Sequence, residues 1–548
     1  MATNDLTQRV DLTRHDRGTG ALRTRRPKYV DFLPPCNDAC PAGENIQAWL
    51  ALAQDGHFKA AWQELVRDNP MPAIHGRVCY HPCEDVCNRV HTDSAVSIHA
   101  VERYLGDLAL ENGWTLVKPD KLSGKKILII GAGPSGLSAA YHLTRKGHTV
   151  IMHEAGPVAG GMIHFGIPKY RMPREELQAE IQRIEDMGVE IVLNHRVEDV
   201  LAEKEAGQFD AVFVSVGAHI SKKIDIPSRD AGKMLDAVSF LSSANEGDRP
   251  KLGRRVAIYG GGNTAMDAAR TAKRLGVDEA IIIYRRDRSS MPAHDFEAEE
   301  ALEEGVKINW LRTIKSIDES TFKVEVMELD ENGRPQPTGE FETLEVDSLI
   351  LAIGQDSDTG FLEKIPGIEF KSDQTVIVGE NMMTGHPGIF AGGDMVPSDR
   401  SVTIAVGHGK QAARHIDAYL DGRTYERSPR HELVGHDKLQ LWYRTSAPQV
   451  EQEQLPIAER QSGFDEIMQN LPEADALFEA KRCLSCGNCF ECDGCYGACP
   501  EGAIIKLGQG ERYRYNFDLC TGCAVCYEQC PCHAIDMIDE PEANPVST

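Results

Sequence analysis

Eleven of the sixteen cysteines in this chain lie between residues 483 and 532. Eight of them form two runs with the same spacing, C-x2-C-x2-C-x3-C, and a proline follows each run. The first run is Cys489, Cys492, Cys495 and Cys499, and the second is Cys520, Cys523, Cys526 and Cys530. Each iron of an iron–sulfur cube needs one thiolate, so this spacing points to metal-cluster chemistry.

The doubled spacing is the ligation pattern of bacterial two-cluster ferredoxins, in which the fourth cysteine of each run binds the other run's cluster. We therefore expect two [4Fe–4S] clusters. The first ligand set is Cys489, Cys492, Cys495 and Cys530, and the second is Cys520, Cys523, Cys526 and Cys499. Structural zinc would not need the doubled spacing, and disulfides would need an exported chain, so both alternatives fit less well.

A glycine-rich motif typical of dinucleotide binding follows the apolar segment 125–130. Gly131, Gly133 and Gly136 stand in the order G-x-G-x-x-G, a helical pattern follows, and the apolar segment 148–153 ends at Glu154. The glycines permit the tight turn, the approach of the pyrophosphate and close helix packing, and the acid accepts ribose hydrogen bonds. This full context favours a nucleotide-binding domain over an ordinary glycine-rich turn.

A second motif of this kind, G-x-G-x-x-A, follows the predicted strand 256–259 and precedes the predicted helix 266–275. The next predicted strand, 280–284, ends in two arginines instead of an acid. Guanidinium groups bind a 2′-phosphate, so this site favours NADP(H) over NAD(H); the alternative is that both arginines form a solvated face. The expected nucleotide contacts are Gly260, Gly262, Asn263, Thr264, Ala265, Arg285 and Arg286.

Two later apolar segments, 346–354 and 388–394, are each predicted to be a buried strand that enters a glycine turn and returns to the first domain. Asp394 ends the second segment, where a carboxylate can hold a ribityl hydroxyl of a flavin; the alternative is a helix or turn cap. Thr403 opens a predicted helix whose N-terminal amides would face the flavin.

Length and composition narrow the class of protein. A chain of 548 residues exceeds one core and predicts three to five domains. The net charge of −25 argues against nucleic-acid binding, and no apolar run is long enough to cross a bilayer. Because residues 1–30 contain no apolar stretch of a signal peptide, we expect a reducing, cytoplasmic location in which the cysteines serve metal.

Several sequence motifs together resemble those of the glutamate synthase small-subunit family of flavoproteins. This family includes the electron-input half of dihydropyrimidine dehydrogenase and the large subunit of NADH-dependent ferredoxin:NADP oxidoreductase. The resemblance covers about residues 30–425. It rests on residues 131–136, 160–168, 170–173, 260–267, 284–287, 291–293, 352–355 and 390–394.

The resemblance implies that FAD takes hydride from NADPH and that clusters in an N-terminal helical domain carry electrons onward. Gly161, within the segment 160–168, is also expected to contact FAD. Related disulfide reductases need a cysteine pair beside the flavin, and no cysteine occurs between residues 88 and 482. We therefore expect no disulfide chemistry, and flavin-based hydride transfer needs no protein acid or base.

The resemblance also implies a ligand set for the cluster nearest the flavin. Cys40, Cys79 and Cys83 match three cysteines of such relatives, and Glu102 matches the carboxylate or amide that supplies the fourth ligand. The alternative role for Glu102 is that of a surface carboxylate on a helix.

Four cysteines then remain in two half sites. Cys36 and Cys87 lie near the N-terminus, whereas Cys483 and Cys486 lie in a phrase that resembles the opening of the N-terminal cluster domain in shorter relatives. Our hypothesis is that the two pairs complete one further [4Fe–4S] cluster across the chain, because loop closure costs little more for long loops. The alternatives are unmetallated thiols or zinc, and only Cys532 is left over.

We expect a multidomain α/β protein with two Rossmann-like domains, an N-terminal α-helical cluster domain and a C-terminal α+β ferredoxin-like domain. The expected parts are an arm (1–30), a helical cluster domain (31–120), an FAD domain (121–245 and 346–425), an inserted NADP domain (246–345), a linker (426–480) with a helical end near 464–471, a ferredoxin module (481–535) and a tail (536–548).

The expected function is that of an NADPH:acceptor oxidoreductase. Electrons pass between NADP(H), FAD and three to four [4Fe–4S] clusters, and on to ferredoxin or to a larger subunit, such as a 2-oxoacid:acceptor oxidoreductase, in a hetero-oligomer. The alternatives are a freestanding ferredoxin–NADP reductase or a glutamate synthase small subunit, for which the ferredoxin module is superfluous. A non-enzymatic electron-transfer scaffold would need empty nucleotide sites.

Overall fold

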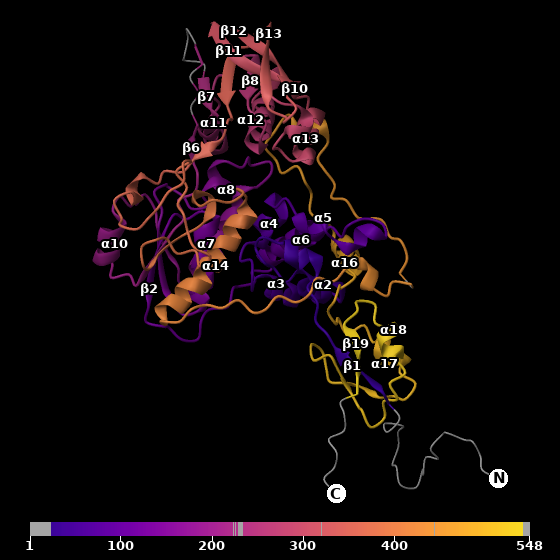
Figure 1. Cartoon of the computed structure of the whole chain (residues 1–548). Coiled ribbons are helices and arrows are strands. Elements are labelled where there is room, and N and C mark those ends of the chain that lie inside the picture. Colours follow the sequence, from indigo (N-terminus) through magenta and orange to yellow (C-terminus); the bar gives the residue numbers. More distant parts are fainter. Residues whose placement is uncertain are drawn as a thin grey trace, which may run out of the picture.

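The computed structural model describes residues 23–540, except 223, 225, 228–233, 319 and 443. Most of the expected arm and the last eight residues of the expected tail therefore lie outside the described residues. Figure 1 shows four parts: a nucleotide-binding domain at the top, a second at the left, a helical domain in the centre and the ferredoxin module below it. Within the described residues, no helix has both the length and the apolar character of a membrane span.

The first nucleotide domain is built on a five-stranded parallel sheet in the order β16-β5-β2-β3-β4. Its central strands are almost wholly buried because helices cover both faces, which explains their continuous apolar runs. The strands are β2 (Lys126–Ile130), β3 (Thr149–His153), β4 (Glu190–Val192), β5 (Ala211–Val214) and β16 (Ile389–Ala391). The helices are α7 (Pro134–Arg145), α8 (Met162–Phe165), α9 (Arg174–Asp186), α10 (Val200–Ala206) and α14 (Val402–Leu420), with short 3-10 turns η5 (Gly360–Leu362) and η6 (Gly393–Met395).

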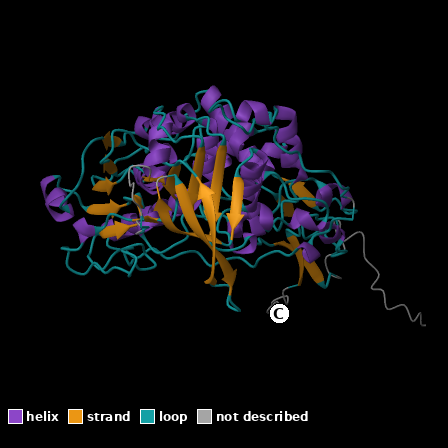
Figure 2. Cartoon of the chain, turned by 90° about the horizontal axis from the view of Figure 1, so that it is seen from above, coloured by secondary structure: helices purple, strands orange, loops and turns teal. Residues whose placement is uncertain are grey.

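The second nucleotide domain has a parallel sheet in the order β10-β9-β8-β14-β7. Figure 2 looks down onto this end of the molecule and shows strands in the centre with helices gathered along one side. The strands are β7 (Met234–Asp236), β8 (Arg255–Tyr259), β9 (Glu279–Tyr284), β10 (Lys307–Trp310) and β14 (Ser348–Leu351). The helices are α11 (Ala237–Glu246), α12 (Asn263–Arg274) and α13 (Asp295–Glu303), with the turn η4 (Arg288–Ser290).

The expected boundaries of this inserted domain, 246 and 345, were wrong. Strand β14 was assigned to the first domain, yet it pairs with β8 in the register Ser348↔Val256 and with β7 on its other side. The sequence of a short buried strand does not indicate which of two neighbouring parallel sheets it joins, because both sheets require the same continuous apolar run. The chain passes between the domains through a small antiparallel pair, β6 (Ile220–Ser221) and β15 (Gln355–Asp356).

An antiparallel sheet that the sequence analysis missed extends from this domain. Its strands are β11 (Arg312–Asp318), β12 (Thr321–Leu329) and β13 (Pro335–Glu345). One face packs on the parallel sheet, where Ile314, Phe322 and Val324 join a buried cluster with Ile281. The alternation of buried and exposed residues along β12 is typical of a sheet with one solvated face.

The helical domain lies between the first nucleotide domain and the ferredoxin module (Figure 1). Trp49, Leu50 and Leu65 are its buried centre. The helices are α1 (Pro35–Ala39), α2 (Ile46–Gln54), α3 (Phe58–Leu65), α4 (Pro72–Val78), α5 (Pro82–Asp85) and α6 (Ile98–Glu111), with the turn η2 (Asn88–His91). Ala476 and Ala480, on the distant helix α16 (Glu473–Arg482), complete the same core.

The segment 426–480, expected to be a linker, contacts all four parts of the molecule. Besides α16 it contains η7 (His436–Lys438) and α15 (Ile457–Arg460). The helix expected near 464–471 was wrong: the segment is irregular and the helix begins at Glu473, directly after Pro472. Glu466 is instead drawn into ion pairs with Arg77 and Arg103 of the helical domain.

The ferredoxin module contains α17 (Gly494–Ala498), β17 (Ile504–Lys506), β18 (Tyr513–Tyr515), α18 (Val525–Glu528) and β19 (Ile535–Asp539). Strand β1 (Arg25–Tyr29) pairs antiparallel with β19, in the register Pro27↔Met537. The expected boundaries at residues 30 and 535 were therefore wrong here, because one strand from each end of the chain closes this sheet. Figure 1 shows the two strands side by side, indigo against yellow.

Candidate functional site

A cavity of about 830 Å³ lies between the two nucleotide domains. Residues from both glycine-rich motifs line it, together with Tyr80 of the helical domain. Of the predicted nucleotide-site residues, it is lined by Gly131, Gly133, Glu154, Gly161, Asp394, Asn263 and Thr264. Gly136, Gly260, Gly262, Ala265, Arg285, Arg286 and Thr403 lie outside the lining. The size and mixed polarity of the cavity suit a dinucleotide cofactor.

The first glycine turn is shaped for close approach. Gly131 has a φ of +101°, and a Cβ there would lie 2.5 Å from the Ser215 carbonyl oxygen, so only glycine fits. A Cβ on Gly161 would lie 2.9 Å from the Gly133 Cα, so these two backbones face each other across the cavity wall. The helix that follows, α7, begins at Pro134 and directs its N-terminus toward the cavity.

Glu154 holds this turn together as well as lining the cavity. Its Oε2 accepts a hydrogen bond from the Ala132 amide at 2.8 Å, and its Oε1 accepts one from the Gly156 amide at 2.7 Å. A carboxylate has further lone pairs, so it can still accept hydrogen bonds from ribose hydroxyls.

Asp394 presents a desolvated carboxyl group to the cavity. Burial raises its pKa to about 6, although Arg400 opposes the shift. Among the described residues, its carboxylate has no hydrogen-bond donor. An unpartnered acceptor at this place fits the hydroxyl groups of a flavin ribityl chain.

Thr403 lies elsewhere than expected. It is buried, and its hydroxyl lies within hydrogen-bonding reach of the Cys79 thiol. Its neighbours Ser401 and Val402 line the cavity instead, so the first turn of α14 stands between the cavity and this cysteine.

The second glycine turn meets the helical domain through residues that the sequence analysis missed. The Asn263 amide donates to the Tyr80 hydroxyl at 2.6 Å, and its side-chain oxygen accepts from the His294 amide at 3.1 Å. The rings of Tyr80 and His294 stack with centroids 3.8 Å apart. Because Tyr80 directly follows Cys79, these contacts fix the nucleotide turn against a cysteine-bearing loop.

Arg171, in the first nucleotide domain, links that domain to the second. Its guanidinium pairs with Asp267 at 2.9 Å and with Glu297 at 2.6 Å, and Asp267 lies on α12, directly behind the turn. Arg285 is exposed and Arg286 is half-buried at the end of β9, where both remain available to a phosphate.

The structure gathers Cys40, Cys79 and Cys83 beside the loop that carries Tyr80. Burial raises the pKa of the Cys83 thiol, and the neighbouring Glu84, Cys40 and Cys79 raise it further. Glu102 is buried, and burial followed by the charge of Glu44 holds its pKa well above the usual range. Charge interactions also link Glu102 to Cys40 and Cys79, so the four predicted ligands form one group.

Glu44 is an acid in this group that the sequence analysis missed. The Asn69 amide donates to Glu44 at 3.0 Å and to Glu102 at 2.8 Å. His75 Nδ1 lies 3.7 Å and 3.8 Å from the same two carboxylates. Two buried carboxyl groups this close do not both stay ionised on their own, so either one of them carries a proton or Glu102 binds a cation such as cluster iron.

Cys36, Cys87, Cys483 and Cys486 also come together, as the split-site hypothesis requires. They line one small cavity with apolar neighbours such as Leu50 and Val96. Burial raises the pKa of the Cys36 thiol, and Cys483, Cys486 and Cys87 raise it in turn. Hydrogen bonds hold the halves together: among them, Asn88 donates to the Cys486 sulfur at 3.5 Å, and Arg89 donates to the Arg482 carbonyl at 2.7 Å.

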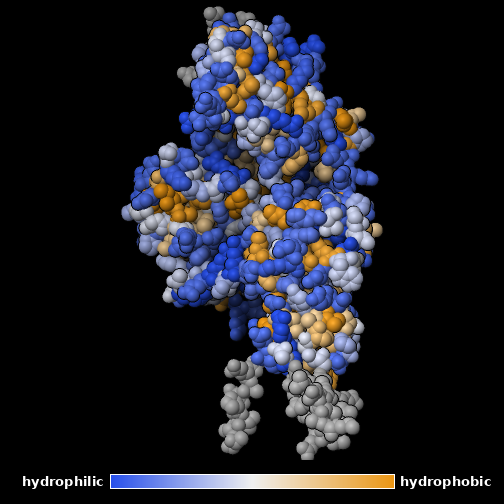
Figure 3. Space-filling model, turned by 45° about the vertical axis from the view of Figure 1, so that its right-hand side comes forward, coloured by the Kyte–Doolittle hydropathy of each residue, from blue (hydrophilic) through white to orange (hydrophobic). Residues whose placement is uncertain are grey.

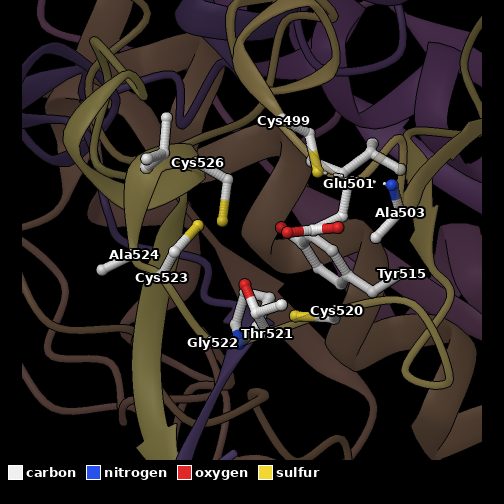
Figure 4. Close-up of a pocket in the computed structure, with 13 residues that line it drawn as sticks. Cys499, Glu501, Ala503, Tyr515, Cys520, Thr521, Gly522, Cys523, Ala524 and Cys526 are labelled. Atoms are coloured by element: carbon white, nitrogen blue, oxygen red, sulfur yellow. Dashed lines mark hydrogen bonds between the residues drawn. The ribbon is translucent and has the colours of Figure 1, made fainter. Parts of the chain in front are cut away.

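In the ferredoxin module, the structure brings the cysteines of each expected crossed set close together. Figure 4 shows the sulfur atoms of Cys499, Cys520, Cys523 and Cys526 around one cavity. In the other set, burial raises the pKa of the Cys495 thiol to about 12, and Cys489, Cys530 and Cys492 contribute to that rise. Four thiols that repel one another when ionised are a donor set suited to iron.

Contacts join each ligand set to the next. The charge of Cys36 acts on Cys83, and the Gly487 amide, next to Cys486, donates to the Cys532 carbonyl at 2.7 Å. The Cys532 sulfur lies 3.8 Å from that of Cys530, and Cys495 and Cys526 interact across the module. The sets thus follow one another from the large cavity to Cys523, which is exposed.

These features define an oxidoreductase with FAD-type and NADP-type domains and iron–sulfur domains at both ends. Sequence comparison agrees: a pyridine nucleotide-disulphide oxidoreductase domain matches residues 125–409, the 4Fe–4S domain II of dihydropyrimidine dehydrogenase matches 31–114, and a 4Fe–4S binding domain matches 513–536. The chain belongs to the pyridine nucleotide-disulphide oxidoreductase family, within the group that contains the glutamate synthase small chains.

Three curated relatives illustrate the group. The β subunit of the NADP(+)-dependent formate dehydrogenase of Moorella thermoacetica is 35% identical, over 91% of this chain and 76% of the relative. The β subunit of the NADPH-Fe(3+) oxidoreductase of Geobacter sulfurreducens is 33% identical, over 84% and 76%. The glutamate synthase [NADPH] small chain of Escherichia coli is 31% identical, over 76% of this chain and 98% of the relative.

Proposed function

We propose that this chain passes electrons between NADP(H), FAD and four [4Fe–4S] clusters, and exchanges them with a partner subunit or ferredoxin at its C-terminal module. The observation that carries the proposal is the unbroken succession of ligand sets from the large cavity to the exposed Cys523. The relatives named NADP(+)-dependent formate dehydrogenase and NADPH-Fe(3+) oxidoreductase subunits support NADPH as the nucleotide.

FAD, when bound, would accept hydride from NADPH and release single electrons, chemistry that the cofactor itself supplies. The contribution of the chain is positioning. The Gly131 turn and the N-terminus of α7 would receive the pyrophosphate, and Asp394 would accept a ribityl hydrogen bond. The Asn263–Tyr80 hydrogen bond keeps the second nucleotide turn beside the Cys79 loop, so a bound nicotinamide nucleotide and the nearest cluster set would be held by neighbouring elements.

We infer four clusters. Cys40, Cys79, Cys83 and Glu102 would hold the one nearest the flavin, and Glu44 lies beside Glu102, where both carboxyl groups accept hydrogen bonds from Asn69. The split set and the two crossed sets of the ferredoxin module hold the remaining three. Fifteen of the sixteen cysteines are then ligands, and Cys532 is the exception.

The preference for NADP(H) rests on Arg285 and Arg286. A 2′-phosphate would pair with these guanidinium groups, whereas the acid that receives a free ribose is missing at this strand end.

We propose a cytoplasmic hetero-oligomer, because relatives in this group are named as subunits and because sixteen unpaired cysteines suit a reducing compartment. Figure 3 shows small hydrophobic groups among hydrophilic side chains, one of them on the ferredoxin end.

Anaerobic reduction of the purified holoprotein tests the function. NADPH should bleach the flavin absorbance and then the broad iron–sulfur absorbance, and NADH should do so far more slowly. Arg285→Ala should lower kcat/KM for NADPH by about tenfold or more and leave that for NADH little changed, since a charged hydrogen bond contributes roughly 1.5–3 kcal/mol.

Arg288→Ala is the matched control, because Arg288 stands in the same loop but is paired with Glu299 at 2.9 Å. Flavin that neither nucleotide bleaches would contradict the proposed function. An equal loss for both nucleotides in Arg285→Ala would contradict the assignment of the 2′-phosphate site.

A further inference from the structure

The loop that carries Cys520 and Cys523 is covered by a strand from the opposite end of the chain. Pro27, on β1, lines the same small cavity as Cys499, Cys520, Cys523 and Cys526. Gly522, between two of these cysteines, has a φ of +73°, and a Cβ there would lie 2.3 Å from the Arg25 carbonyl oxygen. The backbone of this loop and that of the N-terminal strand are therefore in direct contact (Figure 4).

Arg23, just before β1, is directed into this loop. Its Nη1 donates to the Cys520 carbonyl at 2.9 Å and also to the Phe517 carbonyl, and its guanidinium lies 5.1 Å from the centre of the Phe517 ring. Only 6% of the side chain is exposed. A guanidinium that binds two carbonyls of one loop fixes the shape of that loop.

The orientation of the Arg23 guanidinium group is also fixed. Nε and Nη2 donate to the Glu540 carboxylate, both at 2.7 Å, so the acid occupies one edge of the guanidinium and the cysteine loop occupies the other. The edge of the guanidinium that does not face Glu540 therefore lies at the backbone of a ligand cysteine, and charge near a cluster alters its reduction potential.

We propose that the N-terminal strand is part of the terminal cluster site, and that Arg23 is a positioning residue that both holds the Cys520 loop and raises the reduction potential of the cluster bound there. The inference deepens the proposed function and rests on its assignment of this ligand set. A cluster with a raised potential at the outermost position favours the arrival of electrons from the inner clusters.

Arg26 offers a matched control. It lies on the same strand, its guanidinium is 5.0 Å from the same Phe517 ring, and it approaches Glu540 at 4.0 Å. Its side chain is 29% exposed, and within the described residues it makes no hydrogen bond to the Cys520 loop. Arg26→Gln thus removes an equal charge from the neighbourhood and leaves the hydrogen bonds to the two loop carbonyls in place.

The test is a redox titration of the full-length holoprotein, followed by electron paramagnetic resonance, with iron content measured in parallel. Arg23→Gln should lower the midpoint potential of one ferredoxin-module cluster so that its electron-transfer equilibrium constant falls about tenfold, which equals about 59 mV for one electron. Arg23→Lys should restore most of the potential, because it returns the charge. Glu540→Gln should shift the potential upward, because it removes the counter-charge.

Four results decide the matter. A shift in Arg23→Gln that exceeds the shift in Arg26→Gln, with rescue by lysine, supports the proposal. Loss of about four irons in Arg23→Gln alone also supports it, because the loop then needs its N-terminal support. Equal shifts in both glutamine variants, or no shift with full iron content in Arg23→Gln, would overturn it. Wild-type protein without ferredoxin-type signals would instead contradict the proposed function.

Discussion

In the ferredoxin module, all eight predicted cluster ligands lie between residues 489 and 530, and two of its cysteines, Cys492 and Cys523, are exposed. In the helical domain, one set joins residues 36 and 87 to residues 483 and 486, and its cavity lies under apolar side chains. The first arrangement is local and reaches the surface, as an exit for electrons requires. The second is assembled from both ends of the chain and is enclosed, as a relay between domains requires.

The ion pairs of the two regions differ in exposure in the same way as their cysteine sets: those at the split site are buried, and the one in the ferredoxin module is exposed. Arg482, directly before Cys483, is 2% exposed and donates to Glu479 at 2.8 Å, to Asp93 at 3.1 Å and to the Ala95 carbonyl at 2.7 Å. In the ferredoxin module, the corresponding pair is Lys506 and Asp493, which are 48% and 51% exposed. The buried network joins the two halves of the split site, whereas the exposed pair joins residues of one module.

The largest expected effect concerns the split site itself. Cys483→Ala should lower the iron content from about sixteen to about twelve per chain, because a cube that loses one of its four buried thiolates is not retained. NADPH should still bleach the flavin of this variant, but electrons should no longer reach the ferredoxin module. Iron analysis and stopped-flow absorbance measure the two effects.

Cys532→Ala is the control for that change, since Cys532 is buried nearby and is assigned to no cluster. Cys523→Ala should lose as much iron but leave the inner clusters reducible by NADPH. Full iron content in Cys483→Ala would show that the four gathered thiols bind no cluster and would remove the contrast between the two regions.

A smaller effect is expected from the polar networks. Arg482→Ala should lower the free energy of unfolding by about 3–5 kcal/mol, because it removes a buried guanidinium that pairs with both Glu479 and Asp93. Lys506→Ala should lower it by no more than about 1 kcal/mol, because the pair is solvated. Urea denaturation of both variants measures the difference, and similar losses would show that the two regions are equally exposed to solvent.

The smallest expected effect depends on pH. Hydrogen bonds from Arg89, at 2.9 Å and 2.7 Å, hold the pKa of Asp93 below its ordinary value of 3.8. A lowered folded-state pKa gives stability that is present above pH 3.8 and lost as the pH falls below it. Asp93→Asn should therefore cost about 1–2 kcal/mol at pH 7, and the cost should shrink toward zero in acid.

Denaturation of Asp93→Asn and wild type at several pH values measures this dependence. Asp493→Asn is the comparison: Lys506 and Tyr513 lower the pKa of Asp493 in the same direction, but its exposure predicts a smaller pH dependence. A cost that persists unchanged in acid would indicate that Asp93 acts through packing and not through its charge.

The sequence was sufficient wherever function is encoded in short spacing. The glycine motifs, the crossed cysteine sets and the acid at Glu154 are local patterns, and the structure forms a turn or a pocket at each of them. Pairing Cys36 and Cys87 with Cys483 and Cys486 needed a count of unassigned ligands, because no local pattern links residues so far apart.

The remaining features depend on tertiary contacts without a local signal. Tyr80, Arg171 and Glu44 act through partners in other domains, so their residue types alone indicate ordinary polar positions. Strand β14 is apolar in either sheet, and the helical pattern near 464–471 was overridden by the ion pairs of Glu466. Thr403 was placed on the correct helix but on the side that faces Cys79 instead of the cavity.

The pairing of β1 with β19 has a consequence for biosynthesis. Arg25 and Met537, which share a hydrogen bond, are 512 positions apart, so a ribosome adding about 5–20 residues per second needs roughly 25–100 s to make the second after the first. The N-terminal half of the split cysteine set waits almost as long for its other half. The split set is complete only after Cys486 has been synthesised, and the strand pair beside the terminal cluster only after residue 539. Cluster insertion at both sites is therefore a late step in maturation, and a chain that stops before Cys483 would keep both nucleotide domains but lack both of these sites.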